Sequence, residues 1–268
     1  MKVIISHDVD HITALEHNKD CIIPKFIVRT FIEHAIGYIS AWEVKRRLKS
    51  VAKNKWQNIE ELMKYDRENE VPSTFFLAVN SGRGLSYSLS DAQRWIKRIL
   101  TQGFNVGAHG ICYRDFYGIK REYETFRQLS GKDGFGIRMH YLRFSDSTPR
   151  YLSESGYLFD STTYEMSNPY SIGGLWEFPI HIMDGYIFCK GARWQNQHLR
   201  QAQATTERII EKGFRTGIKY LSVLFHDRYF TDAYRTWKEW YIWVIDYMRD
   251  NGFSFIDYYR AIEEIESQ

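Results

Sequence analysis

The sequence predicts an α/β fold with a mostly parallel sheet that is closed, or nearly closed, into a barrel. Short apolar runs typical of buried strands alternate with longer amphipathic stretches typical of helices along nearly the whole chain. Several of the apolar runs also stop at a polar residue that can do chemistry, and parallel α/β folds gather their sites at the carboxyl ends of strands. No internal repeat, low-complexity segment or linker divides the 268 residues, so we predict a single domain over residues 1–268.

The first quarter of the chain predicts one strand followed by a helical insertion. Residues 2–7 form an apolar run that indicates a buried strand, and residues 12–70 are mostly helical in pattern. Within the insertion, a basic cluster at 45–55 is either a solvated helix face or a contact for anionic lipid head groups or a pyrophosphate-linked glycan. The apolar positions at helical spacing are Ile23, Phe26, Ile27, Phe31, Ile36, Ile39, Ile59, Leu62 and Met63.

Alternating strands and helices are predicted for the rest of the chain. Ser90 is predicted as an N-cap, because Gln93 three residues later completes a capping-box pattern. Thr148-Pro149 predicts a helix start with proline in the first turn. The predicted order is a strand at 74–79, a helix ending near Gly103, a strand at 104–108, a helix ending at Gly131, a strand at 136–140, a helix ending at Gly156, a strand at 157–160, extended segments at 176–182 and 186–188 around an Asp184-Gly185 turn, a helix at 200–213, a strand at 220–225, a helix ending at Asn251-Gly252, a strand at 253–256 and a short charged tail.

Composition limits the cellular compartments and the binding partners that we expect for this protein. A net charge of +3 does not call for a nucleic-acid partner, and the sequence gives no indication of an oligomeric state. Cys21, Cys112 and Cys189 are odd in number and widely spaced, which is typical of reduced thiols. The N-terminus lacks the pattern of a secretory signal, and no window of about 18 residues is free of charges. We therefore predict a cytoplasmic protein. The aromatic fraction of 16% suits sugar binding or simply an aromatic-rich core.

Two carboxylates end the first strand, in the run Ser6-His7-Asp8-Val9-Asp10-His11. Alternation places Asp8 and Asp10 on one face of an extended strand. Two like charges so close repel unless something positive lies beside them, and a metal ion is one candidate; a capping cluster at a strand end is the plainer alternative. The other strands that end in reactive side chains lead to His109, to Arg138 and His140, and to His226.

The order of these motifs resembles the polysaccharide deacetylases of carbohydrate esterase family 4. The resemblance rests on D-x-D after the first strand, T-F-F, G-x-H, R-x-H-Y, E-F-P and L-F-H, and covers residues 1–11 and 72–257. The segment 136–144 is similar to the members associated with surface-glycan assembly. The resemblance implies a distorted (β/α)7-type barrel, here with a helical insertion after the first strand.

The family resemblance also implies a role for each motif residue. Asp8 corresponds to the general base, Asp10 and His109 to metal ligands, and Arg138 to the residue that orients the base. The main-chain amide of Tyr141 corresponds to an oxyanion donor, and His226 to the acid that protonates the leaving amine. The implied cofactor is a divalent metal, zinc first, with cobalt, manganese or nickel as alternatives.

The chain departs from the family pattern at one ligand. The usual motif is H-x-x-x-H, but Tyr113 stands four residues after His109, and tyrosine is a poor zinc ligand. His140, His11 and Cys112 are the candidates to replace the missing histidine, and we favour His140. Alternatively the metal has only two protein ligands, or metal catalysis has been lost.

Two functions therefore remain open. The first is a metal-dependent hydrolase that removes N-acetyl groups from an amino sugar in a surface glycan or its precursor, with Trp176 or Tyr164 available to stack on a sugar ring. The second is a catalytically impaired glycan-binding or assembly protein on the same scaffold. Glycoside hydrolysis by Asp8 and Asp10 is disfavoured, because glycosidase carboxylates flank the scissile bond from opposite sides.

Overall fold

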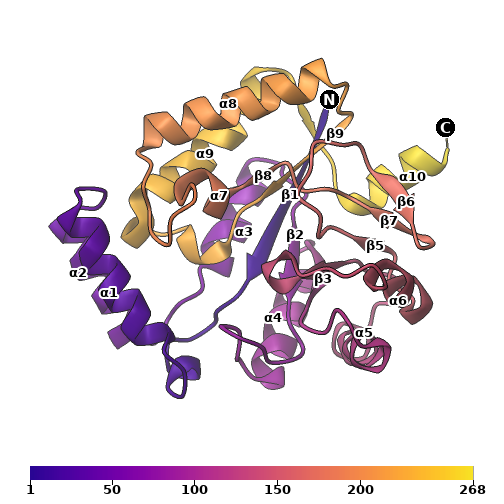
Figure 1. The fold of residues 1–268 in the computed structure, drawn as a ribbon, viewed down its shortest axis with the longest axis horizontal. Helices are drawn as coiled ribbons and strands as arrows, with labels where there is room; N and C mark the ends of the chain where they lie inside the picture. The colour runs from indigo at the N-terminus through magenta and orange to yellow at the C-terminus, as the bar shows by residue number, and fades with distance from the viewer. Residues whose placement is uncertain (268) are drawn as a thin grey trace.

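A computed structural model describes residues 1–267 and contains one curled, mostly parallel sheet (Figure 1). β1 (Lys2–Val9) lies at its centre, paired in parallel with β2 (Thr74–Leu77) and β9 (Tyr220–Leu224). The strand order is β6-β7-β5-β4-β3-β2-β1-β9-β8, and β10 adds to the start of β1. The predicted α/β barrel-type fold is confirmed, as a half-barrel. The remaining strands are β3 (Asn105–Gly110), β4 (Ile137–Met139), β5 (Phe159–Asp160), β6 (Tyr170–Ile172), β7 (Leu175–Glu177), β8 (Ile182–Met183) and β10 (Ser254–Phe255).

Helices connect and cover the strands, and no helix within residues 1–267 is long and apolar enough to cross a membrane. Figure 1 shows α8 and α9 above the central strands and α4, α5 and α6 below them, with α1 and α2 standing at an edge. The α-helices are α1 (Ile22–Ala35), α2 (Ala41–Ala52), α3 (Ile59–Glu68), α4 (Leu89–Thr101), α5 (Phe116–Ser130), α6 (Thr148–Ser155), α7 (Asp184–Phe188), α8 (Leu199–Arg215), α9 (Arg235–Asp250) and α10 (Tyr258–Glu266), and the 3-10 turns are η1 (Leu15–His17), η2 (His140–Leu142), η3 (Asp227–Tyr229) and η4 (Asp232–Tyr234).

The two faces of β1 belong to different parts of the core. Val3, Ile5 and Val9 pack into the large apolar cluster shared with the surrounding helices. On the opposite face, Ile4 belongs to a smaller cluster that includes Tyr258 of α10. Because side chains alternate along a strand, Ser6 and Asp8 continue the inner face toward the carboxyl end of β1. The first strand therefore carries its carboxylates on the concave side of the sheet.

The helix that follows β2 begins two residues earlier than predicted. Ser88, not Ser90, is the N-cap of α4, and its hydroxyl accepts a hydrogen bond from the amide of Asp91 at 3.1 Å. Ser88 has the extended backbone that an N-cap requires, whereas Ser90 lies within the first helical turn. The sequence correctly indicated a serine N-cap in this segment, but it pointed to Ser90 and not to Ser88.

Two segments predicted as extended or irregular are helical. Residues 184–188 form the short helix α7, because the buried carboxylate of Asp184 accepts the amide of Gly185 and holds the chain in a turn. The charged tail forms α10, capped by Asp257. Its apolar side packs into the smaller core cluster through Tyr258, Ala261 and Ile262. Packing against the sheet thus decides both segments.

Candidate active site

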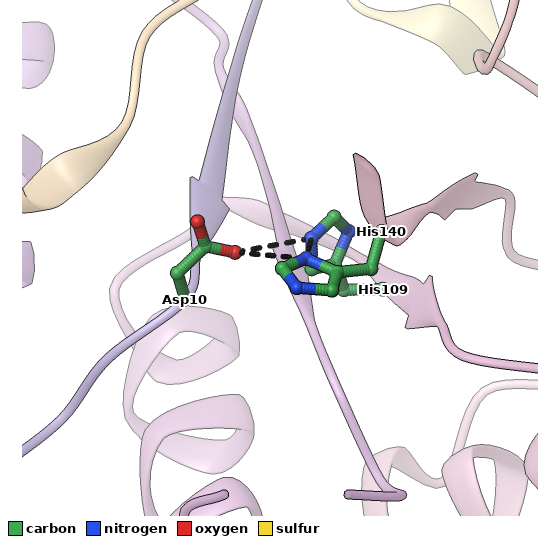
Figure 2. A group of neighbouring side chains, drawn as sticks. All are labelled: Asp10, His109 and His140. Atoms are coloured by element: carbon green, nitrogen blue, oxygen red, sulfur yellow. Dashed lines mark hydrogen bonds and ion pairs between the residues drawn. The ribbon is translucent and has the colours of Figure 1, made fainter. Parts of the chain in front are cut away.

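Three side chains from three strand ends converge at one point (Figure 2). Asp10 Oδ1, after β1, lies 3.2 Å from His109 Nε2 of β3 and 3.3 Å from His140 Nδ1, just after β4. The two histidine nitrogens are 3.0 Å apart. The parallel register places these residues together, since His109 pairs with Arg138 and His140 follows two residues later.

Backbone carbonyls fix the tautomers of both histidines. His109 Nδ1 donates to the carbonyl of Arg138 at 3.0 Å, and His140 Nε2 donates to the carbonyl of Arg83 at 3.1 Å. Because a carbonyl only accepts, the ring protons lie on these outer nitrogens. In the neutral rings, the inner nitrogens therefore present lone pairs to each other and to Asp10. This is how histidine ligands are commonly oriented in metal sites.

The cluster fits a divalent metal ion. Asp10 Oδ1 is buried and has no assigned hydrogen-bond partner within the described chain, so with both rings neutral three electron-rich atoms face one another. Two ligands bound tetrahedrally to zinc, with bonds of about 2.1 Å, lie about 3.4 Å apart. The separations of 3.0–3.3 Å are close to that value. A cation at their centre would remove the mutual repulsion.

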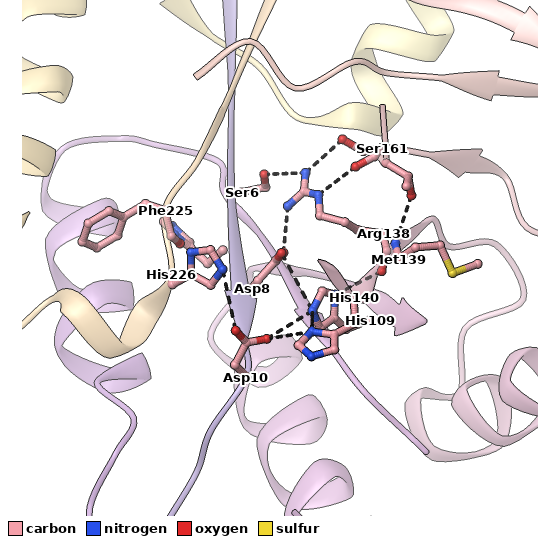
Figure 3. Close-up of polar contacts among 12 residues, drawn as sticks. Ser6, Asp8, Asp10, His109, Arg138, Met139, His140, Ser161, Phe225 and His226 are labelled. Atoms are coloured by element: carbon pink, nitrogen blue, oxygen red, sulfur yellow. Dashed lines mark hydrogen bonds and ion pairs between the residues drawn. The ribbon is translucent and has the colours of Figure 1, made fainter. Parts of the chain in front are cut away.

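A buried arginine holds Asp8 beside this cluster (Figure 3). Arg138 Nη1 donates to Asp8 Oδ1 at 2.8 Å, and both residues are buried. Burial raises the pKa of Asp8, but nearby positive charge, above all that of Arg138, lowers the pKa below its usual value. The other carboxylate oxygen, Oδ2, faces His109 Nε2 at 3.9 Å. Asp8 is thus an ionised carboxylate next to the three converging atoms.

Three further residues keep the arginine in place, and the sequence reasoning missed them. Arg138 Nη2 donates to the hydroxyls of Ser6, Ser161 and Tyr258, each at 2.9 Å. The ring of Phe76 lies beneath the guanidinium, 4.4 Å from its carbon. Ser6 could have been found by alternation, since it shares a face with Asp8. Ser161 and Tyr258 carried no local signal.

His226 faces the cluster from the opposite wall. Its Nε2 lies 3.7 Å from Asp10 Oδ2, and its Nδ1 donates to Asp184 Oδ1 at 2.8 Å. Burial lowers the pKa of His226, but the carboxylates of Asp184, Asp10 and Asp8 raise it to about 10. Asp184 also accepts the backbone amide of His226 at 2.7 Å. The sequence indicated a turn at Asp184, not this contact. Asp227, the next residue in the chain, accepts the amide of Asn58.

Tyr141 has an unusual backbone at the rim of the site. Its φ is +58° and that of Leu142 is +50°, left-handed values that L residues seldom adopt. Strain of this kind occurs where surrounding contacts require it, often at functional sites. It places the Tyr141 ring, which is 59% exposed, directly against the ring of His140 at 4.0 Å.

The other candidates for the missing ligand lie outside this cluster. Tyr113 contacts Arg114 and Arg143 through its ring. Cys112 lies against Asn80 and Glu122, and burial together with the Glu122 charge raises the pKa of its thiol to about 12. His11 contacts His17 at 2.7 Å. Of the three candidates His140, His11 and Cys112, only His140 approaches Asp10 and His109 within the described chain.

His11, Glu16 and His17 form a second buried group of potential ligands. The contact between His11 Nδ1 and His17 Nε2 is a hydrogen bond, and His17 Nδ1 donates to Asp20 at 2.9 Å. Glu16 accepts the backbone amides of Ile12 at 3.2 Å and Thr13 at 2.9 Å, so each member of the group has a hydrogen-bond partner within the protein. These contacts hold η1 in place near the start of the insertion.

The structure also shows the surroundings of the aromatic residues predicted to bind sugar and of the basic segment 45–55. Trp176 donates its indole N–H to Glu266 of α10 at 3.1 Å and packs against the smaller core cluster. Arg47, in the basic segment 45–55, is buried and bonded to Glu33 and the carbonyl of Ala233. Tyr164 is 41% exposed and packs edge-on against Tyr186.

Comparison with known proteins gives a fold likeness only. No family model and no curated protein sequence matches the chain. A solved structure from Mycobacterium smegmatis, assigned as a polysaccharide deacetylase, is 16% identical, with a TM-score of 0.67, and the match covers 100% of this chain and 90% of the other. One from Pseudomonas aeruginosa PAO1 with the same assignment is 15% identical, with a TM-score of 0.61 and coverages of 96% and 87%.

The same fold also occurs in the allantoinase PuuE, which is 12% identical, with a TM-score of 0.60 and coverages of 97% and 87%. Structural neighbours of this chain are thus polysaccharide deacetylases and an allantoinase. One fold can carry different substrates, so the function must be argued from the site itself.

Proposed function

We propose that this protein is a metal-dependent hydrolase that removes the N-acetyl group from an amino sugar in a surface glycan or its precursor. The observation that carries the proposal is the convergence of Asp10, His109 and His140, with lone pairs turned inward, beside a carboxylate held by arginine. The fold likeness to polysaccharide deacetylases supports the same reaction class.

Asp10, His109 and His140 would hold the metal ion, and one carboxylate with two imidazoles is a donor set that zinc accepts readily. Cobalt, manganese and nickel bind similar donors. Bound there, such an ion lowers the pKa of water from about 15.7 to about 7 and polarises a carbonyl oxygen. His140 thereby takes the place of the histidine that the family pattern has at Tyr113.

Asp8 and His226 would carry out the two proton transfers of the reaction. Asp8, kept ionised by Arg138, takes a proton from the attacking water as the new C–O bond forms at the acetyl carbon. His226, held through Nδ1 by Asp184, gives a proton from Nε2 to the amine nitrogen as the C–N bond breaks. The products are acetate and the free amino sugar. The main-chain amide of Tyr141, in its strained turn, is the proposed donor to the oxyanion.

Metal content and acetate release test the proposal together. The Asp8→Asn variant should keep its metal and lose about 100-fold or more in acetate release from acetylated amino sugars, because only the base is removed. The Asp10→Asn variant should lose both the metal and the activity. Removal of the metal with a chelator should abolish acetate release by the wild-type protein, and added zinc should restore this activity.

The test also addresses the alternative of a glycan-binding protein without catalysis. A protein that binds metal at Asp10 but releases no acetate from any acetylated amino sugar would favour the alternative. The proximity of His140 to Asp10 supports the catalytic reading instead. The cytoplasmic compartment and a membrane contact of the exposed part of segment 45–55 stay predictions.

A further inference from the structure

A groove beside the active site carries positive charge. Its volume is about 640 Å³, and it lies between the exposed side of α1, the segment 193–194 and the turn η3. We call it the basic groove, because Lys25, Arg29, Arg193 and Arg228 line it and no carboxylate does. A volume of this size suits a small ligand of several tens of atoms.

The fold neutralises the cations of the basic groove only in part. Arg29 pairs with Glu33 at 2.7 Å, but Glu33 also pairs with Arg47 at 2.5 Å, so one carboxylate serves two guanidinium groups. Arg193 is exposed, and no carboxylate within residues 1–267 pairs with it or with Arg228. The groove therefore carries a net positive charge.

Two aromatic rings pack against the guanidinium group of Arg228. Its guanidinium carbon lies 4.2 Å from the centre of Trp56 and 5.0 Å from that of Phe26. Stacking fixes the plane of the guanidinium, and its N–H groups have no hydrogen-bond acceptor within the described residues. A planar arginine with free N–H groups is well suited to bidentate contact with phosphate.

The basic groove lies next to the proposed catalytic site, because two of its lining residues adjoin residues of that site. His11 and Tyr141 line it, and His11 directly follows Asp10, while the Tyr141 ring packs on His140. A ligand with its acetyl group at Asp10, His109 and His140 would extend past Tyr141 into the groove. The walls there also offer apolar side chains, among them Ile22, Val28 and Trp194.

We propose that the basic groove binds the phosphate groups of the substrate. The substrate would then be an acetylated amino sugar joined through a phosphate or diphosphate to an apolar or aromatic group, and not a neutral glycan chain. This inference rests on the proposed function. The phosphate ester itself is unchanged, since the only bond broken is the amide C–N bond and water supplies the oxygen of acetate and the proton of the amine.

Binding is measured first, with metal-free protein, so that phosphate cannot bind the metal site. The probes are a uridine diphosphate-linked N-acetylated sugar, a short prenyl diphosphate-linked N-acetylated sugar and a neutral trimer of the same sugar. At least one diphosphate-linked sugar should bind tenfold or more tightly than the neutral trimer, with affinity that falls as salt rises. The arm that binds more tightly identifies the nucleotide or the lipid as the source.

Variants locate the binding. Arg228→Gln and Arg193→Gln should each weaken binding of the diphosphate-linked sugar by about tenfold or more, because each removes a charged hydrogen-bond donor. Arg193 is exposed, so its replacement does not disturb packing if the Arg228 variant folds poorly. Arg215→Gln on α8, whose side chain is 76% exposed, is the matched control and should leave binding unchanged.

Two outcomes overturn the inference. One is equal affinity for the neutral and the diphosphate-linked sugars, and the other is binding that neither groove variant weakens. Acetate release by the zinc-loaded protein then separates the two proposals. Release from the neutral trimer, unaffected by the groove variants, would uphold the proposed function and reject the basic groove. Groove-dependent binding of a diphosphate-linked sugar without acetate release would uphold the groove and reject the proposed function.

Discussion

Replacing Tyr258 with phenylalanine tests how the buried arginine is supported. The Tyr258 hydroxyl accepts from Arg138 Nη2 at 2.9 Å and lies 3.1 Å from Ser161 Oγ, in a fully buried position. The substitution removes one oxygen and leaves the ring packed against Phe159. It therefore removes only the polar contacts of one hydroxyl, on a residue 120 positions from Arg138 in the chain.

The structure limits the size of the effect. The two hydrogens on Arg138 Nη2 are shared among three hydroxyls, those of Ser6, Ser161 and Tyr258. After loss of the Tyr258 hydroxyl, two acceptors remain for two hydrogens, so no charged donor is orphaned. The cost should lie near the lower end for hydrogen bonds to charged groups, about 1.5 kcal/mol of unfolding free energy.

Urea unfolding at neutral pH measures this loss, and acetate release measures its consequence for Asp8. We expect a several-fold lower kcat with unchanged metal content, because Arg138 orients the base and touches no ligand atom. Tyr259→Phe is the matched control: the Tyr259 hydroxyl makes only a 3.4 Å contact with the carbonyl of Gly134 at the surface. Equal stabilities for the two variants would refute this account of how Arg138 is held.

Two further predictions use other buried carboxylates. The Asp184→Asn substitution removes the charge that contributes most to raising the pKa of His226, so His226 should lose its proton at a lower pH. The alkaline limb of the kcat–pH profile should therefore shift to lower pH, and kcat should fall about 100-fold. An unmoved limb would mean that His226 is not the acid. Burial and the charge of Glu177 raise the pKa of Asp160 well above its usual value, so the folded state holds a proton that the unfolded chain releases above about pH 4. The free energy of unfolding should therefore fall as pH rises, by up to about 1.4 kcal/mol per pH unit. The urea midpoint of the Asp160→Asn variant should not show this loss. A wild-type protein that is equally stable at pH 5 and pH 7 would contradict the prediction.

Local patterns predicted the elements of this fold well where they depend on nearby residues. Gly131 and Gly156 end α5 and α6 in the left-handed conformation, as their positions after apolar periodic runs indicated. The N-cap at Ser90 and the extended segment at 186–188 were predicted wrongly. At α4 two nearby serines offered similar capping patterns, and Ser88 is the one that caps the helix. At 184–188 the deciding contact joins Asp184 to His226, which sequence spacing does not encode.

The sequence by itself determined which residue types stand at the strand ends: carboxylates at Asp8 and Asp10, and imidazoles at His109, His140 and His226. Strand alternation and the rule for parallel sheets were enough to place them at one edge. Among the candidates His140, His11 and Cys112, the tertiary structure decided that His140 approaches Asp10 and His109, because the register between β3 and β4 sets that distance. It also brought Tyr258 and Asp184 to the site and set the four cations of the basic groove together. These contacts join residues far apart in the chain, and packing between elements, not local preference, fixes them.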